Sequence, residues 1–416
     1  MRRAVLALAA AFSLLLASPA AEAQEIFAPL SLEECLAVAE ANHPSLEEAR
    51  ATIDGEEARL GQVRTSNAVK GDASLSASTS SGGNESYSTA FTVSKLVYDS
   101  GRNTLQRKRQ ALSLDSASES ARGTVLSVRT AVKTAYYGLL LAERKRDQAR
   151  EAVGSYERHL NQARAFYEVG TKPKFDVTKA EVDLSNAKMT LVSAEAAVHS
   201  GWATLANAMG VAQSPATLSS SFRPVQPLPS EEAALAGALE NRPDLRSARM
   251  KSEMDRIGIG IAAKGNAATA SVSGSAVLSG SDFPLDDDYR AGVSLSIPVF
   301  DGGTTRYQLD EARAASRGTE AAERRITQSA VHDVRTKLLA VGEAESRIPV
   351  AELLVRQATE NLELAEGRYN AGVGNALEVT DALLAYNEAK VSHVQALHDY
   401  STALSALEQA LGGELE

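Results

Sequence analysis

Side chains able to carry out catalysis or bind a metal are present in the sequence, but their spacing suits neither task. The six histidines stand at positions 43, 159, 199, 332, 393 and 398. The nearest two, His393 and His398, are five residues apart and so do not share a helix face, as ligands of one metal would need to. Glycines 258, 260 and 265 are faintly similar to a phosphate-binding loop, but no strand precedes them and the third is misplaced. The sequence therefore predicts no enzyme, no metal site and no cofactor.

The start of the chain and its charge indicate an exported protein. Residues 1–23 have the pattern of a signal peptide: two arginines, an apolar run from 4 to 17, and Ala21-Glu22-Ala23 before the expected cleavage site. Without them the net charge is 41 − 52 = −11, which makes nucleic acid a poor partner. The one cysteine, Cys35, cannot form an internal disulfide and is expected to be buried on a helix. No later stretch approaches the ~18 apolar residues of a transmembrane helix.

The positioning elements occur twice. Val97-Tyr98-Asp99-Ser100-Gly101 returns 202 residues later as Val299-Phe300-Asp301-Gly302-Gly303, and Tyr167-Glu168-Val169-Gly170 returns at the same offset as Tyr369-Asn370-Ala371-Gly372. The sequence therefore predicts an internal two-fold repeat, with one copy over 24–212, a Ser- and Pro-rich linker over 213–230, and a second copy over 231–416.

Each copy contains a predicted β-hairpin, over about 72–98 and about 269–300. In the second, apolar residues at 291, 293, 295, 297 and 299 alternate with small or polar ones. Strands of about ten residues with this alternation match tilted transmembrane strands, although strands of a soluble sandwich would also fit. Aromatic residues bracket one strand of each hairpin at a spacing of eleven, which after a tilt of ~40° spans about 28 Å. These predicted girdle residues are Tyr87, Tyr98, Tyr289 and Phe300.

Long helices flank each hairpin. A first helix is predicted over 32–66, and apolar residues spaced three and four apart then predict long helices over about 102–167 and 303–369. Each would be about 100 Å long, with a local kink at Pro349 in the second. The long helices end at glycine-containing tips, and returning helices follow over about 175–209 and 376–411. The tip glycines are Gly170, Gly372 and Gly374.

Four strands in one chain cannot close a membrane barrel, because the smallest such barrels have eight. Strand edges left open are not tolerated in lipid, so several chains must combine their strands. A trimer would give twelve strands, and the long helices would continue below them as a coiled-coil tube. The small polar face of the strands favours a hollow tube, so we expect conduction rather than catalysis.

Over essentially its whole mature length the chain resembles the TolC family of outer-membrane efflux proteins. The residues that carry the resemblance are the junctions Val97-Tyr98-Asp99-Ser100-Gly101 and Ile297-Pro298-Val299-Phe300-Asp301-Gly302-Gly303, and the tip Tyr369-Asn370-Ala371-Gly372 running into Glu378-Val379-Thr380-Asp381-Ala382. The resemblance implies a mixed α and β membrane protein: a homotrimer with a twelve-stranded barrel in the outer membrane of a Gram-negative cell, continued by a periplasmic α-helical barrel. It also implies a periplasmic adaptor and an inner-membrane transporter as partners, in tripartite efflux or type I secretion.

The resemblance further implies which residues line and close the periplasmic end. Glu378 and Asp381, one helical turn apart, match acidic residues that ring the narrowest point in the family. Six carboxylates in a trimer should favour cations and invite block by divalent ions. Tyr369 and Asp176 match a hydrogen-bonded pair that keeps the tips closed. A second contact, between an arginine and a threonine, is missing because those positions hold Gly374 and Phe175, so we expect a gate held more by packing than by charge.

The competing interpretation is a periplasmic adaptor, or another extended coiled-coil binding protein, that forms no pore. It would share the signal peptide, the long helices and the trimeric habit, but it needs no duplicated membrane-type hairpin. The sequence names neither the exported substrate nor the class of transporter. The short predicted hairpin loops slightly favour a small solute or a metal cation.

Overall fold

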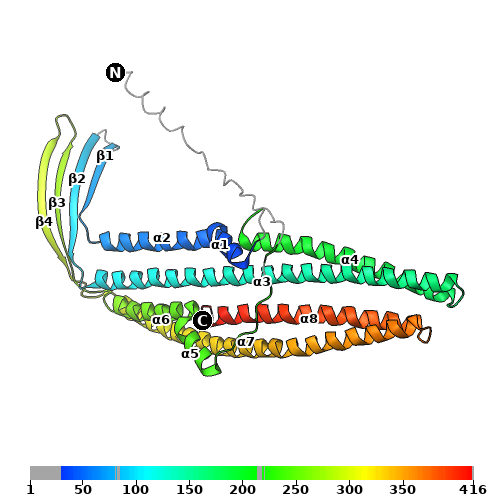
Figure 1. The fold of residues 1–416 in the computed structure, drawn as a ribbon. Helices are drawn as coiled ribbons and strands as arrows, with labels where there is room; N and C mark the ends of the chain where they lie inside the picture. The colour runs from blue at the N-terminus through cyan, green and yellow to red at the C-terminus, as the bar shows by residue number, and fades with distance from the viewer. Residues whose placement is uncertain (1–29, 80, 82–84, 213–217, 220, 415–416) are drawn as a thin grey trace, which may run out of the picture.

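The computed structural model describes residues 30–79, 81, 85–212, 218–219, 221–414 of the chain. The predicted signal peptide, and residues 213–217 and 220 of the predicted linker, lie outside this part. The molecule is elongated: helices lie side by side along its length, and a small sheet stands at one end (Figure 1).

The two halves have the same order of elements. The first half consists of α1 (Leu32–Asn42), α2 (Pro44–Thr65), β1 (Lys70–Thr79), β2 (Glu85–Tyr98), α3 (Arg102–Glu168) and α4 (Lys174–Met209). The second half consists of α5 (Glu231–Asn241), α6 (Pro243–Ala262), β3 (Thr269–Gly280), β4 (Asp286–Ser296), α7 (Thr304–Asn370) and α8 (Ala376–Leu411). The two long helices, α3 and α7, have 67 residues each.

The single helix predicted over 32–66 is wrong, because the chain breaks at His43 into α1 and α2. The cause is Pro44, whose ring disfavours helical backbone in the residue before it. Arg242 and Pro243 make the same break between α5 and α6. By contrast, α7 continues without interruption through Pro349.

The ends of the returning helices α4 and α8 pack against these two helix breaks. Gly210, with φ +73°, ends α4, and a Cβ there would lie 2.8 Å from the Cα of His43. Gly412, with φ +82°, ends α8, and a Cβ there would lie 2.8 Å from the carbonyl carbon of Asn241. Each returning helix therefore abuts the backbone of a helix break, at a distance that only glycine allows.

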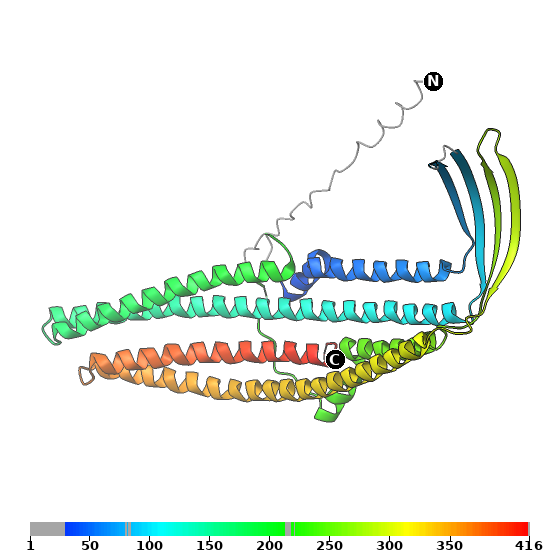
Figure 2. The ribbon, with the colours of Figure 1, turned by 180° about the vertical axis from the view of Figure 1, so that it is seen from behind.

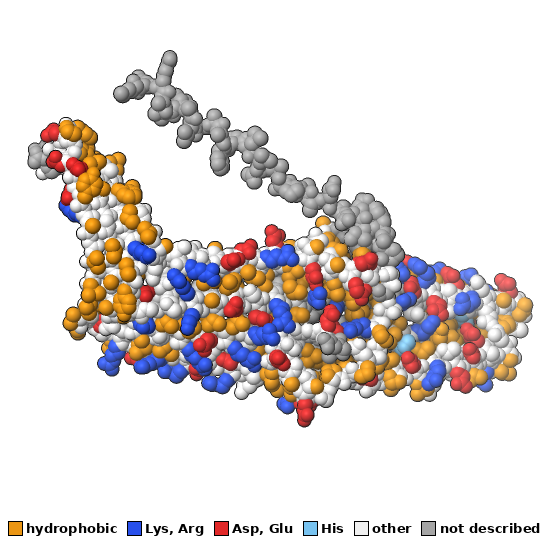
Figure 3. Space-filling model, turned by 60° about the vertical axis from the view of Figure 1, so that its left-hand side comes forward, with side chains coloured by type: hydrophobic (Ala, Val, Ile, Leu, Met, Phe, Trp, Pro, Cys, Tyr) orange, Lys and Arg blue, Asp and Glu red, His pale blue; other side chains and the backbone are white. Residues whose placement is uncertain are grey.

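The four strands form one antiparallel sheet in the order β1-β2-β3-β4, so β1 and β4 are its edges. The strand predicted to reach residue 300 is too long, because β4 ends at Ser296 and leaves Phe300 outside the sheet. Pro298 has no N–H to donate to a neighbouring strand, which accounts for the early end. Apolar side chains lie in patches on the exposed surface of the sheet, among small polar ones (Figure 3), and Leu75 and Val293 are 82% and 77% exposed.

Two antiparallel pairs of helices form the body, α3 with α4 and α7 with α8. Across the array the order is α4, α3, α8, α7, so that α4 and α7 lie at opposite edges (Figures 1 and 2). A buried ion-pair network ties the halves together: Glu408 of α8 accepts hydrogen bonds at 2.7 Å from both Lys133 of α3 and Arg223 of the linker. None of the helices in the described part of the chain is both long and apolar enough to span a bilayer.

Candidate functional site: junctions and helix tips

Asp99 and Asp301 cap the long helices where they leave the sheet. The Asp99 carboxylate accepts hydrogen bonds from the backbone N–H groups of Gly101 at 3.0 Å and Asn103 at 2.6 Å. Asp301 makes the equivalent bonds with Gly303 and Thr305, both at 2.9 Å. Hydrogen bonds from the side chain and backbone of Thr305, and from the backbone of Gly303, lower the pKa of the Asp301 carboxyl. The chain turns from strand to helix at these caps, where Gly101 and Gly303 have φ of 79° and 87°.

The far ends of the long helices close in two equivalent turns. Gly170 follows α3 and Gly372 follows α7, with φ of 75° and 78°. In the first turn the N–H of Thr171 reaches back to the carbonyl of Phe166 at 2.9 Å, and in the second the N–H of Val373 reaches that of Arg368 at 3.1 Å. This pattern satisfies the last carbonyls of a helix and needs a left-handed residue, which glycine provides without strain.

The second tip has no room for a side chain at Gly374. A Cβ at this position would lie 2.9 Å from the backbone nitrogen of Tyr369 and 3.0 Å from the carbonyl carbon of Arg368. An arginine, which the resemblance led us to look for at this position, would therefore not fit, because the turn is folded tightly against the end of α7.

The two predicted aperture carboxylates lie in different surroundings. Glu378 forms an ion pair with Arg368 at 3.3 Å, and its other oxygen accepts a hydrogen bond from the side chain of Asn375, the residue that caps α8. Asp381 is exposed and makes no hydrogen bond or ion pair within the described residues. Of these two carboxylates, only that of Asp381 has no counter-charge among the described residues.

The structure brings Tyr369 and Asp176 together, but without a well-formed hydrogen bond. The Tyr369 side chain is fully buried, and its hydroxyl has no partner of normal hydrogen-bond geometry among the described residues. Burial raises the pKa of Tyr369 to about 12, and the nearby Asp176 carboxylate acts in the same direction. The aspartate is therefore close enough to act on the hydroxyl, while apolar packing holds the ring.

A lysine contact that sequence reasoning missed joins the two tips. The Lys172 ammonium donates a 2.8 Å hydrogen bond to the carbonyl of Gly374, and it lies 5.0 Å from the centre of the Tyr369 ring. Beside it, the side chains of Gln162 and Asn370 are hydrogen-bonded to each other. The tips are thus held by charge as well as by packing. Lys172 occupies the position in the first repeat that Gly374 occupies in the second, 202 residues later. This difference between the two copies is the feature of the sequence that could have pointed to the contact.

A second polar bridge lies next to Asp381. The Lys179 ammonium pairs with Asp183 at 2.5 Å, and the other oxygen of Asp183 accepts a hydrogen bond at 3.2 Å from Thr380 of α8. Lys179 is the repeat counterpart of Asp381, so the two copies place opposite charges at one position. Because Lys179 is paired with Asp183, it does not cancel the charge of Asp381 directly.

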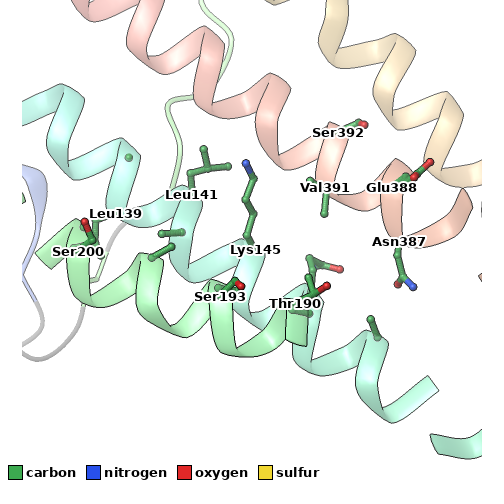
Figure 4. A pocket seen from close by; sticks show the side chains of 18 of the residues that line it. Leu139, Leu141, Lys145, Thr190, Ser193, Ser200, Asn387, Glu388, Val391 and Ser392 are labelled. Carbon is green, nitrogen blue, oxygen red and sulfur yellow. The ribbon is translucent and has the colours of Figure 1, made fainter. Parts of the chain in front are cut away.

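These groups line one end of an open cavity of about 1780 Å³ between α3, α4 and α8. Its wall consists mainly of small or hydroxyl side chains, with Thr190, Ser193 and Ser200 on α4 (Figure 4). Lys145 of α3 also lines it, and donates a 2.8 Å hydrogen bond to Gln395 of α8. No cluster of three or more potential metal ligands occurs in the described part of the chain. Such a surface is polar enough to be wetted by water.

The model of the family described as "Outer membrane efflux protein" matches the chain twice, over residues 36–211 and 234–413. The chain belongs to this family. The TolC-like family, its place in the outer membrane and its role as an efflux duct, all expected from the motifs, are therefore confirmed. The family and its named relatives are outer-membrane efflux and channel proteins.

Named relatives agree with this membership. The chain is 25% identical to the outer membrane protein TolC of Vibrio cholerae over 332 residues, which are 74% of each chain. It is 29% identical to the toluene efflux pump outer membrane protein TtgF of Pseudomonas putida over 310 residues, 71% of this chain and 63% of that protein. The match therefore covers about three quarters of the length of TolC, but less than two thirds of the length of TtgF.

Solved structures show the same fold. CusC superposes with a TM-score of 0.83 at 17% identity, covering 93% of each chain. The open state of the MtrE channel of Neisseria gonorrhoeae superposes with a TM-score of 0.81 at 22% identity, covering 92% of this chain and 89% of that one. The mostly helical fold with a four-stranded sheet in each chain is thus shared with known outer-membrane channels.

Proposed function

We propose that the chain is one of three identical subunits of an efflux channel, each contributing four strands to a twelve-stranded barrel and two helix pairs to a periplasmic tube. The observation that carries the proposal is the sheet with two unpaired edges, β1 and β4, and exposed apolar side chains. In lipid such edges must pair, and pairing β4 of one copy with β1 of the next would close a ring without free edges.

The edges of the helical array support the same closure. Phe175, Val182 and Met189, seven residues apart on α4, are 70%, 52% and 72% exposed. On α7 at the opposite edge, Val350 and Leu364 are 67% and 61% exposed. Apolar seams at both edges are typical of surfaces covered by a partner. In a closed trimer, α4 of each subunit would pack beside α7 of the next.

The periplasmic end of this channel would be narrowed by Asp381 and held shut through the tips. Because Glu378 is paired with Arg368, the aperture would present three unpaired carboxylates rather than six. The proposed gate contacts are Tyr369 with Asp176, and Lys172 with Gly374. Tyr87, Tyr98 and Tyr289 remain the proposed girdle residues in the strands, with Phe300 just beyond β4.

A periplasmic adaptor and an inner-membrane transporter are the proposed partners, because the relatives include outer-membrane components named for efflux pumps. We further propose residues 1–23 as a signal peptide and the two halves as copies of one unit. The alternative of an adaptor without a pore is not retained, since the chain belongs to the channel family.

The decisive experiment is extraction of the mature protein from outer membranes, followed by measurement of its mass and of its conductance in planar bilayers. We expect a trimer that adds discrete ion currents and migrates differently in unboiled and boiled samples. A water-soluble monomer that adds no current would refute the proposal.

A further inference from the structure

His159 is a buried ionisable residue to which the proposed channel function assigns no role. It lies on α3, is 4% exposed, and neither of its ring nitrogens has a hydrogen-bond partner in the described structure. Neutral imidazole carries one donor and one acceptor, and burying both unpaired is costly. Four buried side-chain polar atoms in the described residues lack a partner, and three of them belong to His159 and the Tyr369 hydroxyl.

The His159 ring packs against the ring of Tyr369, with centroids 5.6 Å apart. Phe166 of α3 contacts Tyr369 as well, at 5.4 Å. Because His159 belongs to the first helix pair and Tyr369 to the second, the contact spans the seam that must part if the second pair moves away. Buried polar atoms without hydrogen bonds on both sides of this contact make the packed arrangement of the two helix pairs less stable. Water can form hydrogen bonds with these atoms only when the helix pairs separate.

We propose that His159 is a proton-operated switch of the tip, so that acidification of the periplasmic side favours parting of the two helix pairs. The proposal rests on the proposed channel function and adds a regulation to it. A neutral ring can stay buried against Tyr369, whereas an imidazolium there would be a buried charge without a hydrogen-bond acceptor.

The charged groups around the ring determine the direction of the effect. Burial lowers the pKa of His159; Asp183 and Asp176 on α4 oppose this, and Lys179 on the same helix reinforces it. Tyr369, on the α7 side, is neutral because its own pKa is about 12. The net pKa in the closed form is lowered, so the closed seam is fully stable above the exposed imidazole pKa of ~6.5 and loses stability as pH falls below it.

The test is a conductance measurement on the reconstituted channel with its periplasmic side at pH 7.5 and then at pH 5.0. For the wild type we expect the open probability to rise, by at most about 30-fold per subunit, because pH 5.0 lies about 1.5 units below the exposed imidazole pKa of ~6.5. His159→Phe fills the same space without a proton site and should abolish the response, and His159→Gln, which keeps a polar side chain, should abolish it too. His199→Gln, which removes an exposed histidine of α4, should leave the response unchanged.

A cross-link across the same seam gives an independent readout. In a Cys35→Ser background, cysteines at positions 162 and 370, where the Gln162 and Asn370 side chains are hydrogen-bonded, joined by a short reducible thiol cross-linker, should suppress the pH response until the linker is reduced. A wild type with equal open probability at both pH values, or a His159→Phe channel that still responds, would overturn the switch. Absence of conductance at every pH would instead overturn the channel itself.

Discussion

Replacing Lys172 by methionine is the sharpest probe of the proposed gate. The change keeps the length of the side chain and removes its charge, together with the 2.8 Å hydrogen bond to Gly374 and the contact over the Tyr369 ring. A hydrogen bond from a charged donor contributes ~1.5–3 kcal/mol, which we reduce to about 1 kcal/mol because Lys172 is only partly buried. The cation–π contact adds about 0.5–1 kcal/mol.

Together these contacts stabilise the closed tip by about 2 kcal/mol per subunit, which corresponds to a shift of about 30-fold in the ratio of open to closed tips. Single-channel recording at pH 7.5 should show this increase in open probability for Lys172→Met. Lys174→Met is the matched control, because Lys174 lies two residues away, is exposed and has no partner within the described residues. If the two variants open equally often, Lys172 does not hold the gate.

Three further substitutions test the aperture, the buried tyrosine and the subunit edge. Asp381→Asn should weaken cation selectivity and block by divalent ions more than Glu378→Gln, because only Asp381 lacks a counter-charge; equal effects in reversal-potential measurements would contradict this. Tyr369→Phe removes a buried hydroxyl that has no well-formed hydrogen bond and should leave the conductance no higher than that of the wild type, whereas a marked increase would show that the bond to Asp176 forms in the trimer. Leu364→Glu places a charge in the α7 seam and should shift detergent-extracted trimers toward monomers by at least about tenfold, while Glu366→Lys on the exposed surface of the same helix should not; sedimentation distinguishes the two results.

The sequence predicted the features that are set by local chemistry. The junction aspartates, the tip glycines and the long helices follow from capping, from left-handed backbone and from apolar spacing, and each occurs twice. Two errors came from giving proline too little weight: Pro44 divides the first helix, and Pro298 lies beyond the early end of β4. At Pro349, in contrast, α7 continues past the proline, and the predicted local kink stays a prediction.

The contacts between the tips could not be predicted in the same way. Lys172 with Gly374 and His159 with Tyr369 join residues about 200 positions apart, and their geometry depends on how two helix pairs pack. The resemblance placed Tyr369 beside Asp176, but it could not show that the hydroxyl lacks a well-formed hydrogen bond. Nor could it show that Arg368 neutralises Glu378.

The glycine ends of α4 and α8 limit how a relative of this protein could vary in length. A helix that stops against the backbone at His43 or Asn241 cannot be extended there, so any added residues must go toward the opposite tip. Inserting two heptads before and after each tip turn would lengthen the periplasmic reach by about 21 Å and keep the seams in register. Organisms with wider envelopes could adapt such a duct by changing its far end alone.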